Sequence, residues 1–383
     1  MLENINQFKL LDTYIDNVAE YGFSKENIVV ERRTNNPKRD FLFVNRKQCK
    51  HIPGSPRDMI QMCGLLADRI QQSVPKNAKV MVIAFAETAT AIGNIVADKL
   101  PQCSCVVQTT RELLNGEEIA FEFKEEHSHV TDQRIYSSHL LSEDYDYILL
   151  IDDEITTGTT VINFINGLRS VFGKHHSRCC FGVASICNWQ SSAARERFRQ
   201  YGIELFYLLS GTIRDVNQKV CVEKKPLASV AVGATPKRVV TLKIDSMIPE
   251  RLGHAPNQNI CIFTSALSKV KFKGNSIRVV GTEEFMYVPI RVAEFLENQG
   301  YAVVCHSTTR SPIDVTCCDC TGIRSGIPLP SVYDAARRTY LYNFRDPTDI
   351  TLFITDGNVT DKMRGYLSSI FSCKTLIIMC KGE

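Results

Sequence analysis

The sequence predicts an α/β protein in which a first domain, built on a parallel sheet, is joined to a second, smaller α/β domain. Its 383 residues are enough for two domains that each bury a core. Short apolar runs rich in β-branched residues alternate with segments whose apolar residues recur at helical spacing, which is typical of a parallel sheet flanked by helices. Polar residues cluster directly after one such run, in "YILLIDDEITTGTT" (147–160). Open α/β sheets bind their ligands at such a place.

Composition and charge are those of an ordinary globular protein. Apolar residues make up 44% and charged residues 23% of the chain, and the formal net charge is +3. So small a charge predicts no nucleic-acid partner. No apolar run approaches the roughly 20 residues that span a bilayer, and the first residues lack the basic start and apolar centre of a signal peptide. We therefore expect a cytoplasmic protein without a membrane segment.

The chain has fifteen cysteines, most of them single within apolar segments. Such thiols behave as small buried hydrophobes in a reducing compartment, and this is the expectation for Cys63, Cys187, Cys261, Cys305 and Cys380. The cluster "CCDC" (317–320) offers ligands for a soft metal. Structural zinc usually needs a second ligand pair at matching spacing, and none is evident nearby, which favours a loop with incidental thiols.

The elements expected in the first domain follow in order. A helix (10–21), a strand "DFLFVN" (40–45) and the basic segment "RKQCKHIP" (46–53) form an appendage before the sheet. The sheet then begins with alternating units, a helix at 57–74, a strand at 79–85, a helix at 90–100 and a strand at 103–108. A polar stretch with an Asn-Gly turn predicts a two-stranded hairpin over 111–134 that stands off the sheet.

The segment quoted above supplies the next strand and helix. Tyr147–Ile151 predicts a buried strand, and the apolar periodicity of 161–172 predicts a helix. A strand, a helix and a strand at 180–187, 192–201 and 204–209 complete the domain. We expect a first domain at 1–221, a linker at 222–237 and a second domain at 238–383.

The second domain is expected to repeat this alternation. Its predicted elements are strands at 276–281, 302–306 and 350–355 and helices at 288–298 and 332–340. Segments 80–113 and 277–312 each run through a strand, an acidic loop, a helix, a strand and Thr-Thr-Arg. Internal duplication and convergence of two α/β sheets explain this likeness equally well.

The loop after the strand at 147–151 has the composition of a phosphate site. It consists of Thr156, Thr157, Gly158, Thr159 and Thr160, at the point where the next helix begins. Backbone N–H groups, hydroxyls and the positive end of the helix dipole converge there, and glycine permits the tight turn. A helix cap alone explains one or two of these residues, whereas a bound phosphate explains the set.

Two acids precede the loop. Asp152 and Asp153 can accept hydrogen bonds from vicinal hydroxyls or hold Mg²⁺. A phosphate site beside a diol site describes a ribose 5-phosphate. The chain has no G-x-x-x-x-G-K-[ST] segment and no G-x-G-x-x-G after a strand, which argues against a nucleoside-triphosphate P-loop and a dinucleotide fold.

"ILLIDDEITTGTT" resembles the phosphoribosylpyrophosphate signature of type I phosphoribosyltransferases. The resemblance implies that Asp152 and Asp153 bind the ribose hydroxyls, that 156–160 bind the 5′-phosphate, and that phosphoribosylpyrophosphate is the co-substrate with Mg²⁺ as cofactor. It also implies a flexible hood at 109–136. "ITTG" is closer to the orotate members than to hypoxanthine-type members, which place an Asp at the position of Thr156. A pyrimidine-like acceptor is therefore favoured.

The same resemblance places a pyrophosphate loop at "AETAT" (86–90). Ala86, Glu87, Thr88 and Ala89 are then expected to meet Mg²⁺-pyrophosphate, together with the hydroxyl of Thr90. Glu87 is unexpected beside an anion unless it orients Mg²⁺ or water. Capping of the following helix is the alternative explanation for this Thr-rich turn.

Cations are expected to stabilise the leaving pyrophosphate. Arg111, directly after a strand, and the hood residues Lys124 and His127 are the candidates. Histidines in a charged loop are more often solvated than catalytic. Lys50 and His51 of the basic segment are candidates to cover the acceptor base, with a solvated face as the alternative.

A second resemblance covers the rest of the chain. "STTRSPI" (307–313) resembles the motif of the TRSP domain, which follows orotate-phosphoribosyltransferase-like domains in bacterial tellurite-resistance and stress gene clusters. "FAETATAIG" and "EEHSHVT" are also similar to that family. Arg310 is a candidate to bind a phosphate or carboxylate, with a structural ion pair as the alternative. Asp356, at the place equivalent to the first domain's acid pair, is a candidate for a second nucleotide-like site.

Three classes of function follow. The leading one is a Mg²⁺-dependent phosphoribosyltransferase whose partners are a sugar phosphate and a nucleobase-like acceptor, with a homodimer left open. The second is a sensor that binds phosphoribosylpyrophosphate or nucleotides without turnover. The third is a scaffold whose second domain binds other proteins. Release of pyrophosphate separates the enzyme from the sensor.

Overall fold

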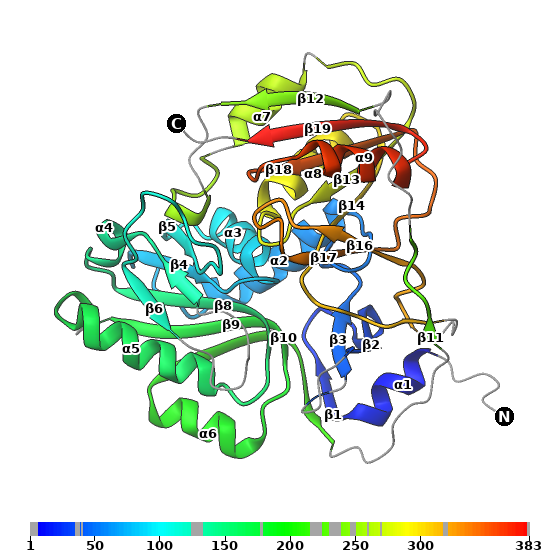
Figure 1. Ribbon diagram of the computed structural model, residues 1–383. Helices are drawn as coiled ribbons and strands as arrows, with labels where there is room; N and C mark the ends of the chain where they lie inside the picture. Colours follow the sequence, from blue (N-terminus) through cyan, green and yellow to red (C-terminus); the bar gives the residue numbers. More distant parts are fainter. Residues whose placement is uncertain are drawn as a thin grey trace.

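Two sheets of mainly parallel strands, each flanked by helices, lie one above the other in the computed structural model of the chain (Figure 1). The residues that the structure describes are 7–34, 39, 41–123, 133–176, 179–214, 224–229, 239–245, 250–258, 260–268, 270–316 and 321–380. The α/β class and the presence of a second sheet, both expected from the sequence, are confirmed.

The first sheet has the strand order β1-β10-β9-β8-β4-β5. The strands are β1 (Ile15–Glu20), β10 (Ile203–Ile213), β9 (Cys180–Asn188), β8 (Tyr147–Ile155), β4 (Val80–Ala84) and β5 (Cys103–Gln108). All neighbours are parallel except β1, which runs antiparallel to β10. The central strands β4 and β8 are the apolar runs noted in the sequence, and their side chains are buried on both faces.

Helices cover both faces of this sheet. They are α2 (Pro56–Gln71), α3 (Thr90–Lys99), α5 (Thr159–His176) and α6 (Ser192–Gln200). Val80 and Val82 share a core with α2 and α3, whereas Met81 and Ile83 share a core with α5. This alternation along β4 follows from the two-residue period of a strand.

The predicted hairpin is present as β6 (Phe121–Phe123) and β7 (Gln133–Ile135), which pair antiparallel and are followed by the short helix α4 (Ser138–Leu141). The ring of Phe123 packs on Phe164 of α5 at a centroid distance of 4.9 Å. The Asn-Gly turn precedes β6 rather than joining the two strands, so its expected role was wrong. The residues between the strands, 124–132, lie outside the described residues.

The second sheet is wholly parallel, with the order β12-β19-β18-β13-β14. Its strands are β12 (Val239–Ile244), β19 (Lys374–Cys380), β18 (Ile350–Thr355), β13 (Ser276–Gly281) and β14 (Ala302–Ser307). Buried residues of α7 (Ile260–Ser268) and α8 (Tyr287–Asn298) share the core on one face, and those of α9 (Asp361–Ile370) share the core on the other. The order β19-β18-β13-β14 matches β9-β8-β4-β5, as both internal duplication and convergence of two α/β sheets would predict.

The helix expected at 332–340 is wrong. A hairpin of β16 (Gly326–Pro330) and β17 (Arg338–Tyr342) stands there instead. Thr339 and Leu341 are buried, and the N–H of Tyr340 donates to the carbonyl oxygen of Thr309 at 2.8 Å. Pairing with a residue far away in the chain has overridden the local helical pattern.

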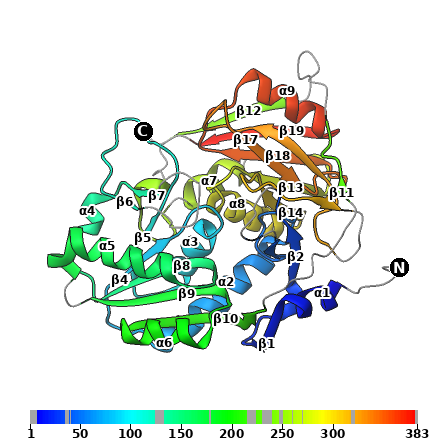
Figure 2. The same ribbon diagram turned by 60° about the horizontal axis from the view of Figure 1, so that its bottom comes forward.

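The N-terminal segment also differs from expectation. The helix expected at 10–21 ends early, because α1 (Gln7–Tyr14) gives way to β1, which extends the edge of the first sheet. The 3-10 helix η1 (Lys25–Asn27) leads to β2 (Ile28–Arg32) and β3 (Phe41–Asn45). This segment is not an appendage: buried side chains of β2 and β3 share a core with the second domain, including Ile313 and Ile323. Figure 2 shows β2 directly below β14.

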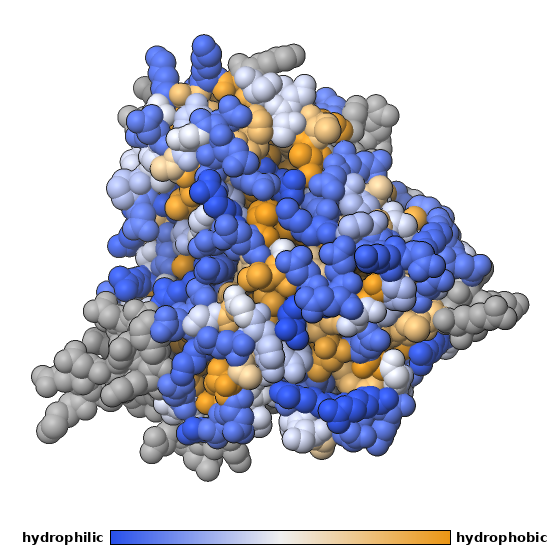
Figure 3. Space-filling model, turned by 180° about the vertical axis from the view of Figure 1, so that it is seen from behind, coloured by the Kyte–Doolittle hydropathy of each residue, from blue (hydrophilic) through white to orange (hydrophobic). Residues whose placement is uncertain are grey.

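Smaller elements and the surface complete the fold. β11 (Lys224–Lys225) pairs with β15 (Val315–Thr316), and η2 (Glu250–Leu252) lies between β12 and α7 in the sequence. Figure 3 shows the face opposite to that of Figure 1, where hydrophilic residues predominate and apolar residues are exposed in separate patches. Within the described part of the chain, no helix is both long enough and apolar enough to cross a membrane. The cysteine expectation holds for Cys63, Cys187, Cys305 and Cys380, which are buried, but not for Cys261, which is exposed.

Candidate functional site

A cavity of about 270 Å³ lies at the carboxyl ends of β4, β5 and β8. It is lined by Arg33, Leu42, Phe43, Gln48, His51, Ala86, Glu87, Thr88, Arg111, Asp152, Asp153, Glu154, Thr156 and Ser311. The sequence therefore located this edge of the sheet correctly. The N-terminal hairpin and Ser311 of the second domain add walls that local patterns did not reveal.

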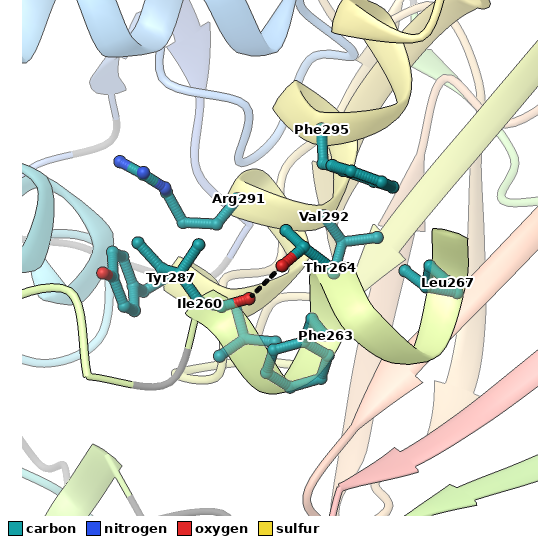
Figure 4. A pocket seen from close by; sticks show the side chains of 9 residues that line it. Ile260, Phe263, Thr264, Leu267, Tyr287, Arg291, Val292 and Phe295 are labelled. Atoms are coloured by element: carbon teal, nitrogen blue, oxygen red, sulfur yellow. Dashed lines mark hydrogen bonds between the residues drawn. The ribbon is translucent and has the colours of Figure 1, made fainter. Parts of the chain in front are cut away.

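A smaller cavity lies between α7 and α8, where Phe263, Leu267 and Phe295 converge (Figure 4). Its volume is about 10 Å³. The hydroxyl of Thr264 donates within its own helix to the carbonyl oxygen of Ile260 at 3.1 Å and does not provide a polar anchor. A cavity of this size holds at most one water molecule. This small cavity is a packing gap between two helices. The larger cavity is therefore the candidate site.

The paired acids lie inside β8, which runs four residues beyond the strand end expected at Ile151. Asp152 pairs in register with Ser185 of β9. The N–H of Asp153 donates to Oδ1 of Asp152 at 2.9 Å. Burial and the adjacent Glu154 carboxylate raise the pKa of Asp153 above its usual value. A cation or a set of hydroxyl donors at this point would relieve the crowding of negative charge.

The carboxylate of Glu154 has a cationic partner and a hydrogen-bond donor within the protein. Nη1 of Arg39 lies 2.7 Å from Oε1 of Glu154, and the indole N–H of Trp189 donates to Oε2 at 3.0 Å. The third acid of "DDE" is thereby held by fixed partners, while all three acids line the cavity.

The predicted phosphate loop lies at the N-terminus of α5, as expected. Gly158 has φ +72°, and a Cβ at this position would approach Phe198 to 2.3 Å. The N–H of Thr159 donates to Oγ1 of Thr157 at 3.3 Å. The loop is therefore a closed turn in which only glycine fits at Gly158, while Thr156 faces the cavity.

The sequence interpretation missed a cation beside this loop. Nη2 of Arg197, on α6, donates to the carbonyl oxygen of Thr157 at 3.0 Å and to Oγ1 of Thr159 at 3.2 Å. Arg197 occupies a helix with other arginines and has no distinguishing sequence signal. Its guanidinium adds positive charge to the helix terminus.

The segment expected to bind pyrophosphate joins β4 to α3, and its Ala86–Glu87 peptide bond is cis. The N–H of Ala86 donates to Oγ1 of Thr109 at 2.8 Å, and the N–H of Ala89 donates to the carbonyl oxygen of Phe85 at 3.2 Å. The hydroxyl of Thr90 donates to the carbonyl oxygen of Glu284 at 2.7 Å. The N–H groups of Ala86 and Ala89 and the hydroxyl of Thr90 therefore each have a partner inside the protein, and the pyrophosphate role of this segment stays a prediction. Ala86, Glu87 and Thr88 line the cavity.

Glu87, unexpected beside an anion, is explained by its partners. Nζ of Lys50 lies 2.8 Å from Oε1 of Glu87, and the two side chains are only 1% and 6% exposed. Nε of Arg310 lies 3.9 Å from Oε2. Although burial raises it, the charges of Lys50 and Arg310 bring the pKa of Glu87 down to about 2. The carboxylate is thus charged but balanced by cations from two other segments.

Lys50 and His51 therefore have different positions from those expected. Lys50 is buried in its contact with Glu87 and also donates to the carbonyl oxygens of Glu283 and Thr308, at 2.5 and 3.1 Å. It is neither solvated nor placed over an acceptor. His51 lines the cavity, and burial together with the Lys50 charge lowers its pKa to about 3. It presents a neutral imidazole.

Of the expected leaving-group cations, only Arg111 is described. It lines the cavity, and its N–H donates to Oε1 of Glu284 at 2.9 Å. Lys124 and His127 lie outside the described residues, as does the cysteine cluster at 317–320.

The two candidates of the second domain are engaged by protein side chains. Nε of Arg310 lies 2.7 Å from Oε2 of Glu283, and its Nη2 contacts Glu112. Asp356 pairs with Arg251 and accepts a hydrogen bond from the hydroxyl of Tyr333 at 2.5 Å. For Arg310 the ion-pair alternative is the one observed. Asp356 occupies the position equivalent to the acid pair of β8, and its carboxylate is held there by Arg251 and Tyr333.

Both parts of the chain match described families. Residues 29–210 match the family described as Phosphoribosyl transferase, and residues 251–370 match the family described as TRSP domain C terminus to that transferase. The chain thus combines a segment similar to the phosphoribosyl transferase family with a following segment similar to the TRSP domain family. No curated protein matches the chain.

Solved phosphoribosyltransferases are distant structural neighbours. The adenine phosphoribosyl transferase of Trypanosoma brucei is 12% identical with a TM-score of 0.35, and the match covers 48% of this chain and 76% of that one. The orotate enzyme of Aeropyrum pernix is 14% identical with a TM-score of 0.31, covering 47% and 86%. The adenine enzyme of Leishmania donovani is 16% identical with a TM-score of 0.35, covering 53% and 79%. Similarity at this level carries no argument about substrate.

Proposed function

We propose that this protein transfers the 5-phosphoribosyl group of phosphoribosylpyrophosphate to a nitrogen of a nucleobase-like acceptor. The bond from C1 of the ribose to the pyrophosphate oxygen breaks, a bond from C1 to the acceptor nitrogen forms, and pyrophosphate leaves. One observation carries the proposal: Asp152, Asp153 and Thr156 line the same cavity as Ala86, Thr88 and Arg111.

Each end of the sugar phosphate has complementary groups. The N-terminus of α5 and the side chain of Arg197 supply positive charge for the 5′-phosphate. Asp152 and Asp153 accept hydrogen bonds from the ribose hydroxyls. Arg111, which follows β5 and lines the same cavity, would balance the charge that develops on the leaving pyrophosphate.

The residues present also fit Mg²⁺. Among the described residues, no group of three or more His, Cys, Asp or Glu side chains is arranged to hold a metal ion by itself. Two carboxylates suit an ion that takes its other ligands from substrate phosphates, which is how Mg²⁺ is usually bound. Bound there through Asp152 and Asp153, Mg²⁺ supplies neutralising charge to the phosphates.

The acceptor wall is formed by Arg33, Phe43, Gln48, His51 and Ser311. An aromatic ring, an amide and a neutral imidazole match the flat face and the polar edge of a single heterocyclic ring. Together with "ITTG" at the phosphate loop, this wall favours a pyrimidine-like acceptor. We place the reaction in the cytoplasm, in a metabolite pathway of the stress and tellurite-resistance type that the TRSP resemblance implies.

A screen of nucleobases tests the proposal. The protein is incubated with phosphoribosylpyrophosphate, Mg²⁺ and one base at a time, and pyrophosphate release is measured. Asp153→Asn, which keeps the shape but removes the charge, should abolish release. Binding of phosphoribosylpyrophosphate without release for any base would instead identify the sensor, and absence of binding heat in titration calorimetry on folded protein would overturn both.

A further inference from the structure

A group of buried charges joins the two domains beside the cavity. This interface cluster comprises Glu87 and Glu112 of the first domain and Glu283, Glu284, Arg310 and Arg337 of the second. It lies where the loops after β4 and β5 meet the loops after β13 and β14, so the carboxyl edges of the two sheets touch through charged side chains.

Arg310 contacts every acid of the interface cluster. Its Nε lies 2.7 Å from Glu283 and 3.9 Å from Glu87, its Nη2 lies 3.3 Å from Glu284 and also contacts Glu112, and its side chain is 13% exposed. Its backbone N–H donates to Oε1 of Glu87 at 3.3 Å. The contacts to Glu87 and Glu112 reach the loops that follow the adjacent strands β4 and β5 of the first domain.

Glu284 fixes the loop that carries Arg111. Its carboxylate accepts from the hydroxyl of Thr110 at 2.5 Å and from the N–H of Arg111 at 2.9 Å. Its carbonyl oxygen accepts from Thr90 at the start of α3. Although burial raises it, Arg251 and Arg310 lower the pKa of Glu284 below its usual value. A second-domain carboxylate thus orients the expected leaving-group cation.

The acceptor wall depends on the same domain. The N–H of Thr34 donates to the carbonyl oxygen of Pro312 at 3.0 Å. The N–H of Asp314 donates to the carbonyl oxygen of Arg32 at 2.9 Å. These bonds attach the chain on both sides of Arg33 to the segment that follows Arg310. Ser311, within that segment, lines the cavity directly.

We propose that Arg310 is a positioning residue for phosphoribosyl transfer: through Glu87 it holds the segment 86–90 in the shape that receives pyrophosphate, so the second domain forms part of the active site. The inference rests on the proposed function. Arg310 acts on the pyrophosphate end of the substrate and not on the 5′-phosphate end, because the Thr156–Thr160 loop makes its contacts with Arg197 and Phe198 instead.

This asymmetry distinguishes positioning from general structural support. Phosphoribosylpyrophosphate occupies both ends of the cavity, whereas ribose 5-phosphate reaches only the loop at 156–160 and the acid pair. Damage to the fold weakens both ligands. Loss of the Arg310–Glu87 contact should weaken only the ligand that carries pyrophosphate.

The test is titration calorimetry of both ligands with Mg²⁺ present, on the full-length protein. The variants are Arg310→Gln, Glu87→Gln and the double variant. Arg337→Gln is the matched control, since among the described residues the contacts of Arg337 within the interface cluster go to Glu112 and Glu283. We expect each single variant to weaken phosphoribosylpyrophosphate binding by about tenfold, because each removes the attraction between the Arg310 guanidinium and the buried Glu87 carboxylate, which lie 3.9 Å apart.

Three further results are expected. The affinity of each variant for ribose 5-phosphate should stay within about twofold of that of the parent protein. The double variant should bind phosphoribosylpyrophosphate no more weakly than the single variants. Arg337→Gln should leave the ratio of the two ligand affinities unchanged. Equal weakening of both ligands, or additive effects in the double variant, would overturn the proposal. If Arg310→Gln does not fold, the isosteric Glu87→Gln decides by the same ratio. A parent protein that binds neither ligand refutes the proposed function instead.

Discussion

Gly158 offers a quantitative test of the phosphate loop. Its φ of +72° lies in the left-handed region, and a Cβ there would come within 2.3 Å of Cε1 of Phe198 and 2.7 Å of Nε2 of Gln190. Left-handed backbone costs a residue with a Cβ about 1–2 kcal/mol, and overpacking costs about 1–3 kcal/mol. Gly158→Ala should therefore lower the free energy of unfolding by about 2–5 kcal/mol.

Two other glycines separate these contributions. Gly202 has φ +66°, and a Cβ added there would meet no atom within 4 Å, so Gly202→Ala should show the backbone cost alone. Gly64 lies inside α2, and a Cβ there would also have no atom within 4 Å. Gly64→Ala should raise the free energy of unfolding by about 0.5–1 kcal/mol, because alanine is the better helix former.

Urea unfolding of the three variants, with calorimetry of ribose 5-phosphate, is the assay. The expected order of stability is Gly64→Ala, then Gly202→Ala, then Gly158→Ala, and only the last should bind ribose 5-phosphate more weakly. Equal destabilisation by Gly158→Ala and Gly202→Ala would refute the claim that Phe198 packs against the loop. Unchanged ligand affinity in a folded Gly158→Ala protein would refute the phosphate site.

The remaining predictions concern His51 and Ser311. Burial and the charge of Lys50 lower the pKa of His51 to about 3 from 6.5, so the unfolded chain takes up this proton first and stability falls as the pH drops from 6.5 towards 3. His51→Gln should reduce the loss between pH 6.5 and 5 by about 2 kcal/mol, measured by urea unfolding at both pH values; an identical loss would contradict a neutral buried imidazole. Ser311→Phe should block base-dependent pyrophosphate release while leaving calorimetric affinity for ribose 5-phosphate unchanged, whereas Ser369→Phe, on the exposed side of α9, should alter neither. Normal release from Ser311→Phe would remove Ser311 from the acceptor wall.

The parts of the fold that local pattern determines were predicted well. The strands at 103–108, 276–281 and 350–355 have the expected bounds, and α3 differs from its expected range by one residue. Their apolar periodicity is strong and agrees with the tertiary environment. The place of the loop at 156–160, between a strand and a helix start, was predicted in the same way, since its strand, glycine and helix start are neighbours in the sequence.

The failures share a different cause. The segments at β1 and β17 have helical patterns but are strands, because β1 pairs with the distant β10, and β17 pairs with β16 and also bonds to Thr309. The role of Lys50 was missed for the same reason, since its partners include Glu87 and carbonyl groups more than 200 residues away. No local signal records such contacts.

By itself, the sequence determined the α/β class, the two sheets and the position of the Thr/Gly loop at 156–160 between a strand and a helix, because residues close in the chain suffice for each. Only the tertiary structure showed that Arg310 meets Glu87, a residue 223 positions away, and that Ser311 lines the first domain's cavity. Charge balance in a buried interface depends on which distant segments meet. Packing of the two domains decides which distant segments meet, and with it which residue of the second domain lines the cavity.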